Sequence, residues 1–452
     1  MDRNRINTDN MTARRTAPAA DARTADPRRA QPSRDPRGTA HDPRGAAPSQ
    51  EKPAPGAGAP AADKKDKKYK TKFVKPHSIV RIRGGVDRPM LIIILVLLGF
   101  GLVMVFSASF AAAHKVLGDS FYYIKRQGAF AILGLIAMFA VSFFDYRFFR
   151  RFAPLLFVIT LGLMVIAGVY GRARGVAARW IDLKIISIQP SEIMKLAIVL
   201  FFANYCATHR EEINDYSDFR RSSIWGDIIP IGIIGVVGAA MVLQKHFSGL
   251  IILALIGMTV IFAGGARKFW FLLGGGIGAG VTLIFIMIND YAKKRIDVFL
   301  HPENYSKLNE TWQTLNGLNA VGSGGLLGVG LGNSYMKYSY VSAPQNDFIF
   351  SIVCEELGFI GATALILLFV LFAWRGFVIA MRAPDTFSAL TAFGITSKVI
   401  IQVILNIGVV TNVIPNTGIA LPFFSYGGSA LLIQLTEMGV LLAISRYSYK
   451  EE

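Results

Sequence analysis

The chain has 452 residues, 52% of them hydrophobic, with a mean hydropathy of +0.43 and a formal net charge of +18. One soluble core would not use this much apolar sequence, which excludes an ordinary soluble globular protein. The sequence has no Walker-type loop and no Cys and His cluster at zinc spacing. It therefore supports neither an ATP-driven pump nor a structural zinc site.

The first 88 residues form a basic segment that is rich in Ala, Pro, Arg, Asp and Gly and ends in a Lys-dense stretch at 64–75. We expect it to be disordered because it cannot bury enough apolar surface to fold. The first long apolar run begins near Met90, too far along the chain for a cleaved secretory signal. The positive-inside rule places the segment in the cytoplasm. Its lysines favour anionic membrane lipids over nucleic acid, for which no fold motif is present.

Residues 89–446 are predicted to be an all-α, polytopic integral membrane domain, followed by a short cytoplasmic tail at 447–452. Apolar runs of about 17–25 residues recur there, each long enough to cross a hydrocarbon core of about 30 Å. About ten spans are predicted, at 89–110, 127–145, 152–170, 190–207, 226–243, 249–264, 269–289, 349–373, 387–411 and 427–445.

An even number of spans returns the C-terminus to the cytoplasm. The inner loops then contain Arg147, Arg150, Arg151, Arg210, Arg220, Arg221, Arg267, Lys268, Arg375 and Arg382, as the positive-inside rule requires. The outer loops keep cations as well, among them Arg172, Arg174, Arg179, Lys184, Arg295 and Lys337. These are either solvated charges and headgroup contacts or part of a site for an anion.

The long outer loop, about 289–348, contains a Gly-dense stretch from Gly322 to Gly332 and ends in Asp347. Loops of this length are usually functional or disordered, and the aromatic residues here argue against disorder. We interpret Asp347, at the outer mouth of the eighth span, as functional. Glu355 and Glu356 lie deeper in an apolar segment, where we expect a structural pairing with Lys or Arg.

Other charged residues also lie inside predicted spans. Glu192 and Lys195 share one face of the fourth span, where they line a cavity or neutralise one another, and we favour pairing. Lys398, in the ninth span, extends to the cytoplasmic face or pairs within the bundle. Cys206 and Cys354 are predicted on opposite sides of the bilayer midplane, so no disulfide is expected.

Three sequence blocks together resemble the SEDS family of bacterial envelope proteins, which includes FtsW, RodA and SpoVE. They read GLGNSYMKYSY from Gly330, NDFIFSIVCEELG from Asn346, and PNTGIALPFFSYGGSALL from Pro415. Further matches are ARWIDL from Ala178, IQPSEIMKL from Ile188 and RIDVFLHPE from Arg295. The resemblance covers nearly everything after the basic segment, and its C-terminal block leans towards an FtsW-type division protein.

The resemblance implies a peptidoglycan glycosyltransferase of the bacterial cytoplasmic membrane that polymerises lipid II on the outer face. The expected partners are a class B penicillin-binding protein as transpeptidase and other division-complex membrane proteins. The family's catalytic acid maps onto Asp347, the expected general base. Arg179, Arg295 and Lys337 are candidates for diphosphate contact, aided by a divalent cation, Mg²⁺ or Mn²⁺. The other candidate site residues are Glu192, Lys195, Ser425, Gly427 and Gly428.

Two departures from the family pattern matter. The segment before Asp347 lacks a second carboxylate, which leaves metal binding open. His246 stands where many relatives have an acidic turn, and a lone His there is more typical of a satisfied interfacial residue than of a metal ligand. The turn that begins at Ser425 is either a re-entrant or capping segment or a tight structural turn.

Two other functions remain open, a lipid II flippase and a scaffold of a division complex. The residues with reactive side chains gather on one face of the membrane domain, and the sequence shows no clear internal repeat. Both observations favour an enzyme over a transporter. The sequence alone leaves division, elongation and sporulation as alternative settings.

Overall fold

The computed structural model describes residues 84–173, 179–182, 187–215, 218–267, 290–301, 312–338 and 340–447, with single positions or pairs at 275–276, 280 and 287. The expected basic tail and the seventh predicted span, 269–289, lie almost wholly outside these ranges. The regular secondary structure of the described residues is helical apart from the antiparallel pair β1 (Ile181–Asp182) and β2 (Ser187–Ile188).

The long helices are α1 (Arg88–Leu117), α2 (Tyr122–Ser142), α3 (Tyr146–Ala173), α4 (Pro190–Thr208), α7 (Ile229–Leu243), α8 (Phe247–Ala263), α12 (Ile349–Met381), α13 (Thr386–Val410) and α14 (Gly428–Ser445). Shorter elements are α5 (Arg210–Ile213), α6 (Phe219–Ser223), the π-helical turn η1 (Ile224–Ile228), α10 (Asp290–Leu300) and α11 (Trp312–Ser323).

Eight helical segments within the described ranges are long and apolar enough to cross a membrane, and α8 is a shorter apolar helix. They match nine of the ten predicted spans in place and order. The fifth segment is longer than predicted because α6 and η1 lead into α7 without a break, giving a helix from Phe219 to Leu243. The protein is therefore a polytopic helical membrane protein, as the apolar runs predicted.

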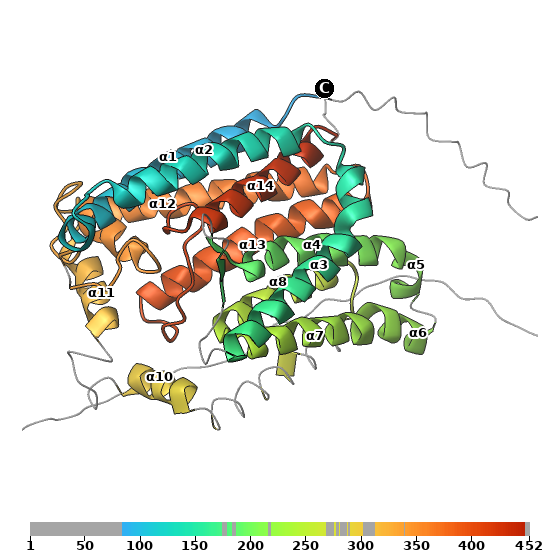
Figure 1. Ribbon diagram of the computed structural model, residues 1–452. Helices are drawn as coiled ribbons and strands as arrows, with labels where there is room; N and C mark the ends of the chain where they lie inside the picture. The colour runs from blue at the N-terminus through green and yellow to red at the C-terminus, as the bar shows by residue number, and fades with distance from the viewer. Residues whose placement is uncertain are drawn as a thin grey trace, which may run out of the picture. The chain divides into compact units, whose positions relative to one another are not determined.

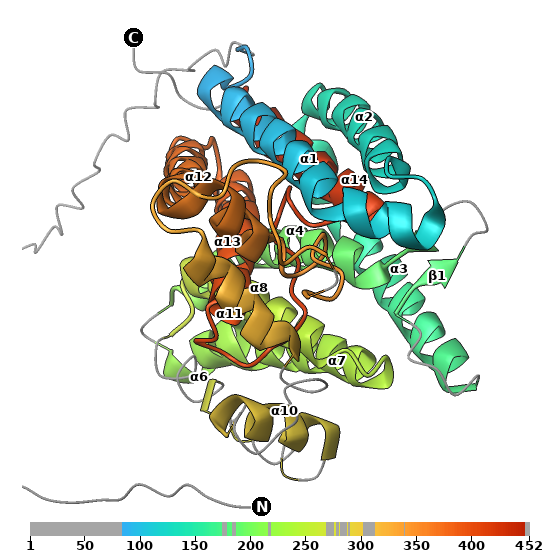
Figure 2. The same ribbon diagram turned by 90° about the vertical axis from the view of Figure 1, so that its left-hand side faces the viewer.

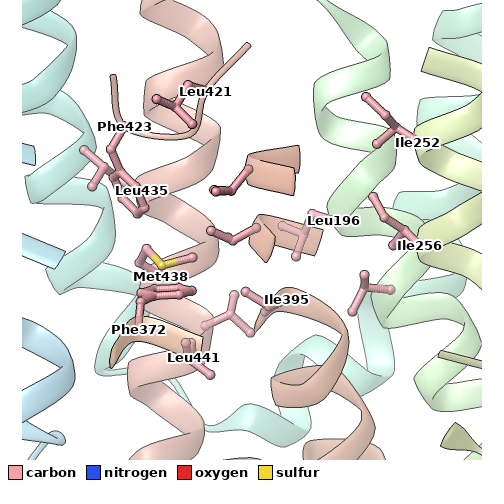
Figure 3. Close-up of a cluster of buried hydrophobic side chains, with 14 of the residues drawn as sticks. Leu196, Ile252, Ile256, Phe372, Ile395, Leu421, Phe423, Leu435, Met438 and Leu441 are labelled. Atoms are coloured by element: carbon pink, nitrogen blue, oxygen red, sulfur yellow. The ribbon is translucent and has the colours of Figure 1, made fainter. Parts of the chain in front are cut away.

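The helices pack around α4, α13 and α14. Figure 1 shows α14 beside α2 and α12 beside α13, and these pairs are in close contact. Apolar side chains from α4, α8, α13 and α14, including Leu196, Ile256, Ile395 and Met438, fill the space between them (Figure 3). Gly439 lets α14 approach the backbone of α2, since a Cβ there would lie 2.6 Å from the Met138 carbonyl oxygen.

One end of the bundle is tied together by polar contacts, and we call it the clasp end. The Asp87 carboxylate caps α1 and forms a two-point ion pair with Arg375 at 2.5–3.0 Å, and its backbone N–H donates to Ser445. Arg446 donates to the Gly84 carbonyl. The basic residues predicted for the inner loops that the structure describes gather here, because α3 and α13 begin at this end and α4, α12 and α14 end at it.

Candidate active site

At the other end of the bundle, residues from several separate segments enclose a cavity of about 660 Å³. Six of the predicted site residues line it: Glu192, Lys195, Asp347, Ser425, Gly427 and Gly428. The start of α4, the α7–α8 turn, the segment just before α12, α13 and the segment before α14 all contribute to its wall. Figures 1 and 2 show how these helices are arranged. The fold therefore gathers residues that are up to hundreds of positions apart in the sequence.

Asp347 lies at the cavity wall two residues before α12 begins. A helix N-terminus favours negative charge nearby, so the position suits an ionised carboxylate. Gly418 faces it with φ +67°, and a Cβ at Gly418 would lie 3.5 Å from one Asp347 carboxylate oxygen. A Cβ at that distance would be in ordinary contact, so it is the left-handed backbone conformation beside the carboxylate that favours glycine here.

The segment around Ser425 is fastened to the residues just before Asp347. Ser425 Oγ donates to the Asn346 carbonyl at 2.6 Å and accepts from the Leu421 N–H at 2.7 Å. The Tyr426 N–H donates to the Gln345 carbonyl at 2.8 Å. This segment is a packed turn that caps the cavity and leads into α14.

Gln127 of α2 fixes the same turn from the other side. Its side-chain amide donates to the Ser425 carbonyl at 3.3 Å and accepts from the Gly427 N–H at 3.2 Å. Gly428 lies against the Phe130 ring, where a Cβ would come within 2.2 Å of a ring carbon. Gly427 and Gly428 therefore contribute backbone and space to the cavity wall rather than chemical groups.

Glu192 and Lys195 form an ion pair of 2.7 Å, with side-chain exposures of 18% and 6%. Both also line the cavity. The two sequence interpretations, pairing and cavity lining, thus describe the same residues. Glu192 places a second carboxylate in the cavity with Asp347, from a different helix rather than from the segment just upstream.

A second ion pair lies deeper in the bundle. Lys398 Nζ contacts Glu437 at 2.6 Å and donates to the Gln434 side chain at 2.5 Å, and all three side chains are buried. Of the two alternatives for Lys398, pairing within the bundle is confirmed. Lys398 lies one turn of α13 below Gln402, which lines the cavity.

His246 lines the cavity from the α7–α8 turn, where Arg179 Nη2 donates to the neighbouring Lys245 carbonyl at 3.0 Å. Burial lowers the pKa of His246 to about 4, with Arg179 and Lys195 acting in the same direction. The imidazole is therefore neutral near pH 7. Arg179 fastens the segment before β1, and the adjacent Trp180 faces the cavity.

Lys337 is not part of this cavity wall. Its side chain is fully buried and forms an ion pair with Glu356 at 2.9 Å, while its ammonium also donates to the Gly332 carbonyl. This geometry gives Lys337 a structural partner, and the expectation that it contacts a diphosphate finds no support. It also confirms that Glu356 is a buried partner of a lysine. The side chain of Arg295, in α10, lies outside the described residues.

Arg126, Trp180 and Gln402 also line the cavity, and sequence reasoning did not single them out. Arg126 Nη1 donates to the Tyr122 hydroxyl at 2.7 Å, and the side chain is exposed at the rim. A signal existed in the Lys-Arg-Gln run at the outer end of the second predicted span. In the sequence alone, a cation that lines a cavity looks the same as a surface cation that contacts lipid headgroups.

The described residues contain no group of three or more His, Cys, Asp or Glu side chains arranged to hold a metal ion. The donor set therefore does not form a ready-made metal cage, and no step below is routed through a metal. Cys206 and Cys354 are both free thiols, which confirms that they are not joined to each other.

The sequence model of the FtsW/RodA/SpoVE family of cell cycle proteins matches residues 88–450. The chain belongs to this family. It is 43% identical over 365 residues to the stage V sporulation protein E of Bacillus subtilis strain 168, covering 80% of this chain and 97% of that protein. It is 37% identical over 364 residues to a probable peptidoglycan glycosyltransferase FtsW of Trichlorobacter lovleyi, covering 79% and 93%.

Solved structures agree with this assignment. A chain from a peptidoglycan synthase complex, solved to explain the coordination of polymerization and crosslinking, superposes with a TM-score of 0.66 at 25% identity. The alignment covers 81% of this family member and 99% of that chain. The rod shape determining protein RodA of Thermus thermophilus has the same fold, with a TM-score of 0.59 at 24% identity over 81% of this chain and 98% of that one.

Proposed function

We propose that this family member is a peptidoglycan glycosyltransferase that polymerises lipid II, with the cavity as its active site. The observation that supports it most is the position of Asp347, which shares one cavity with Glu192, Lys195 and the turn at Ser425. An FtsW relative that is 37% identical to this chain, and that the match covers to 93% of its length, is named as a probable enzyme of this kind. A cavity of several hundred Å³ with a few convergent polar groups is typical of a substrate site.

In the proposed reaction the Asp347 carboxylate takes the proton of the acceptor's 4-hydroxyl. The freed oxygen forms a bond to the anomeric carbon of the donor sugar. The bond from that carbon to the diphosphate breaks, and the diphosphate leaves with the electron pair. The leaving group is already a stable anion, so it needs counter-charge rather than a proton.

The cations that line the cavity are Arg126 at the rim and Lys195 on α4. Lys195 is offset by Glu192, whereas among the described residues Arg126 contacts the tyrosines Tyr122 and Tyr426 rather than a carboxylate. We therefore assign the main diphosphate contact to Arg126, with Lys195 beside it. A guanidinium suits this task because it donates in a planar fork to phosphate oxygens.

The cavity end is proposed to face outward and the clasp end the cytoplasm. The support is the charge distribution: Arg150, Arg210, Arg267, Arg375 and Arg446 all belong to the clasp end. The positive-inside rule places such an end in the cytoplasm. Both termini are then cytoplasmic.

We further propose a class B penicillin-binding protein as partner and cell division as the setting. The partner is suggested by the synthase complex that contains the similar chain. Its relatives include both FtsW proteins and a sporulation protein. Depletion of the protein from growing cells therefore tests whether it acts in cell division. Filaments without septa support division, whereas normal growth with a block in spore formation contradicts it.

The deciding experiment is reconstitution of the purified protein with labelled lipid II, with and without the partner. Glycan polymer supports the enzyme. Leaflet exchange of lipid II without polymer would make the protein a flippase, and the absence of both from a folded complex would favour a scaffold.

A further inference from the structure

Asn406, on the last turns of α13, bridges the two chain segments that flank the Asp347 carboxylate. Its side-chain amide nitrogen donates to the backbone carbonyl of Asp347 at 2.7 Å and to that of Ile419 at 2.7 Å. The Asn406 side chain is completely buried. The two N–H groups of this one amide thus donate hydrogen bonds to two separate backbone segments.

The two bridged segments are those that shape the site. Ile419 follows Gly418, the glycine with positive φ that lies beside the Asp347 carboxylate. Asp347 itself precedes α12. Asn406 projects from a long, well-packed helix. It therefore fixes the positions of two irregular segments that would otherwise be held only by contacts with each other. A site built on loops requires such support from a regular element.

The side chains closest to asparagine in shape or size do not supply both hydrogen-bond donors. An aspartate at 406 would place acceptor oxygens against two carbonyl oxygens, and a leucine would fill the space without donating to either. A serine offers a single hydroxyl donor for two acceptors. The geometry thus requires an amide at this position.

We propose that Asn406 is a positioning residue that fixes the backbone of Asp347 and, through Ile419, the glycine beside its carboxylate. It does not contact the substrate. Its kinetic consequence rests on the proposed function, because a general base displaced by about 1 Å can lose about a hundredfold in rate. Its structural consequence, a fixed position for residue 347, holds whatever reaction the cavity performs.

The kinetic test compares Asn406→Leu, Asn406→Ser and Asn406→Asp with the wild type in lipid II polymerisation. We expect kcat to fall by at least about tenfold for Leu and Asp and less for Ser, with KM nearly unchanged, because the substrate contacts remain. The matched control is Thr396→Val, a buried, isosteric change from polar to apolar in the same helix. Wild-type kcat in a folded Asn406→Leu protein would overturn the proposal.

A second measurement is independent of catalysis. Asp347→Cys gives a thiol at the cavity, whereas Cys206 and Cys354 are buried and should react slowly. We expect a membrane-impermeant maleimide to label residue 347 several-fold faster when Asn406→Leu is added, and at an unchanged rate when Thr396→Val is added. An unchanged rate with Asn406→Leu refutes the positioning role. Failure of the wild type to polymerise lipid II would refute only the proposed function.

Discussion

Two sets of carboxylates in one short stretch of chain have opposite surroundings. Asp347 lies at the cavity, whereas Glu355 and Glu356, fewer than three turns later, are buried at 2% and 0% exposure. All three would look alike in an apolar sequence segment. The difference comes from the long loop before α12, which contacts the two glutamates in a different way from Asp347.

The loop before α12 folds back onto the two glutamates and satisfies them. Glu356 accepts from Ser107 of α1 at 2.6–2.7 Å and pairs with Lys337. Glu355 accepts from the Ser334 hydroxyl and the Tyr335 N–H. Buried charges persist only with such partners. The glutamates therefore hold the loop in place, and Asp347 is left to face the cavity.

The largest effect is expected from Asp347→Asn, which keeps the shape of the side chain and removes its ability to take a proton. A general base contributes about a hundredfold to ten-thousandfold in rate, so polymerisation of lipid II should become undetectable. Thermal stability, membrane insertion and partner binding should stay near wild type. Substantial polymer from this variant would rule out Asp347 as the base.

Lys337→Ala should instead act through folding, because it leaves the Glu356 carboxylate buried without its cation. Breaking a buried ion pair costs about 3–5 kcal/mol, which would appear as a lowered unfolding temperature in detergent. The double variant Lys337→Met with Glu356→Gln should recover much of that loss. A well-folded Lys337→Ala protein with a raised KM would return Lys337 to the substrate site.

The contrast between these residues also shows what the sequence can reveal. Apolar run length predicted the spans, since about 20 residues are needed to cross a bilayer whatever the tertiary structure. The resemblance placed Asp347. The buried pairing of Lys337 with Glu356 was not visible in the sequence, because a cation in an outer loop and a cation folded beneath that loop have the same local sequence. Only long-range contacts separate the two.

The same reason explains why Asn406, Gln402 and Arg126 were missed. Asn406 acts through Asp347, 59 positions away, and Gln402 and Arg126 line the cavity beside residues that are distant in sequence. By contrast, Glu192 and Lys195 were found because a helix brings residues three apart onto one face. Local periodicity is visible in one sequence, and convergence of segments is not.

A smaller effect is expected at His246, whose pKa falls from 6.5 to about 4 on burial. The folded protein favours the neutral imidazole, so its contribution to stability is complete above about pH 6.5 and is lost as the pH falls towards 4. Thermal stability should drop over that window, and His246→Gln should weaken the drop. Because the imidazole stays neutral above pH 6, His246→Gln should leave the shape of the pH–rate profile from pH 6 to 8 unchanged. A new inflection there would show that His246 titrates during catalysis.

The smallest effect is expected from deleting residues 1–70, because the cavity-lining residues that the structure describes all lie at Arg126 or later in the chain. The deletion also stops short of Gly84 and Asp87, whose contacts with Arg446 and Arg375 close the clasp end. Polymerisation in detergent should therefore remain near the wild-type level, although placement of the protein in the cell can change. The matched comparison is Asp87→Ala in the full chain, which removes the α1 cap and the ion pair to α12 and should lower thermal stability. Loss of polymerisation in a folded protein lacking residues 1–70 would make the basic segment part of the enzyme.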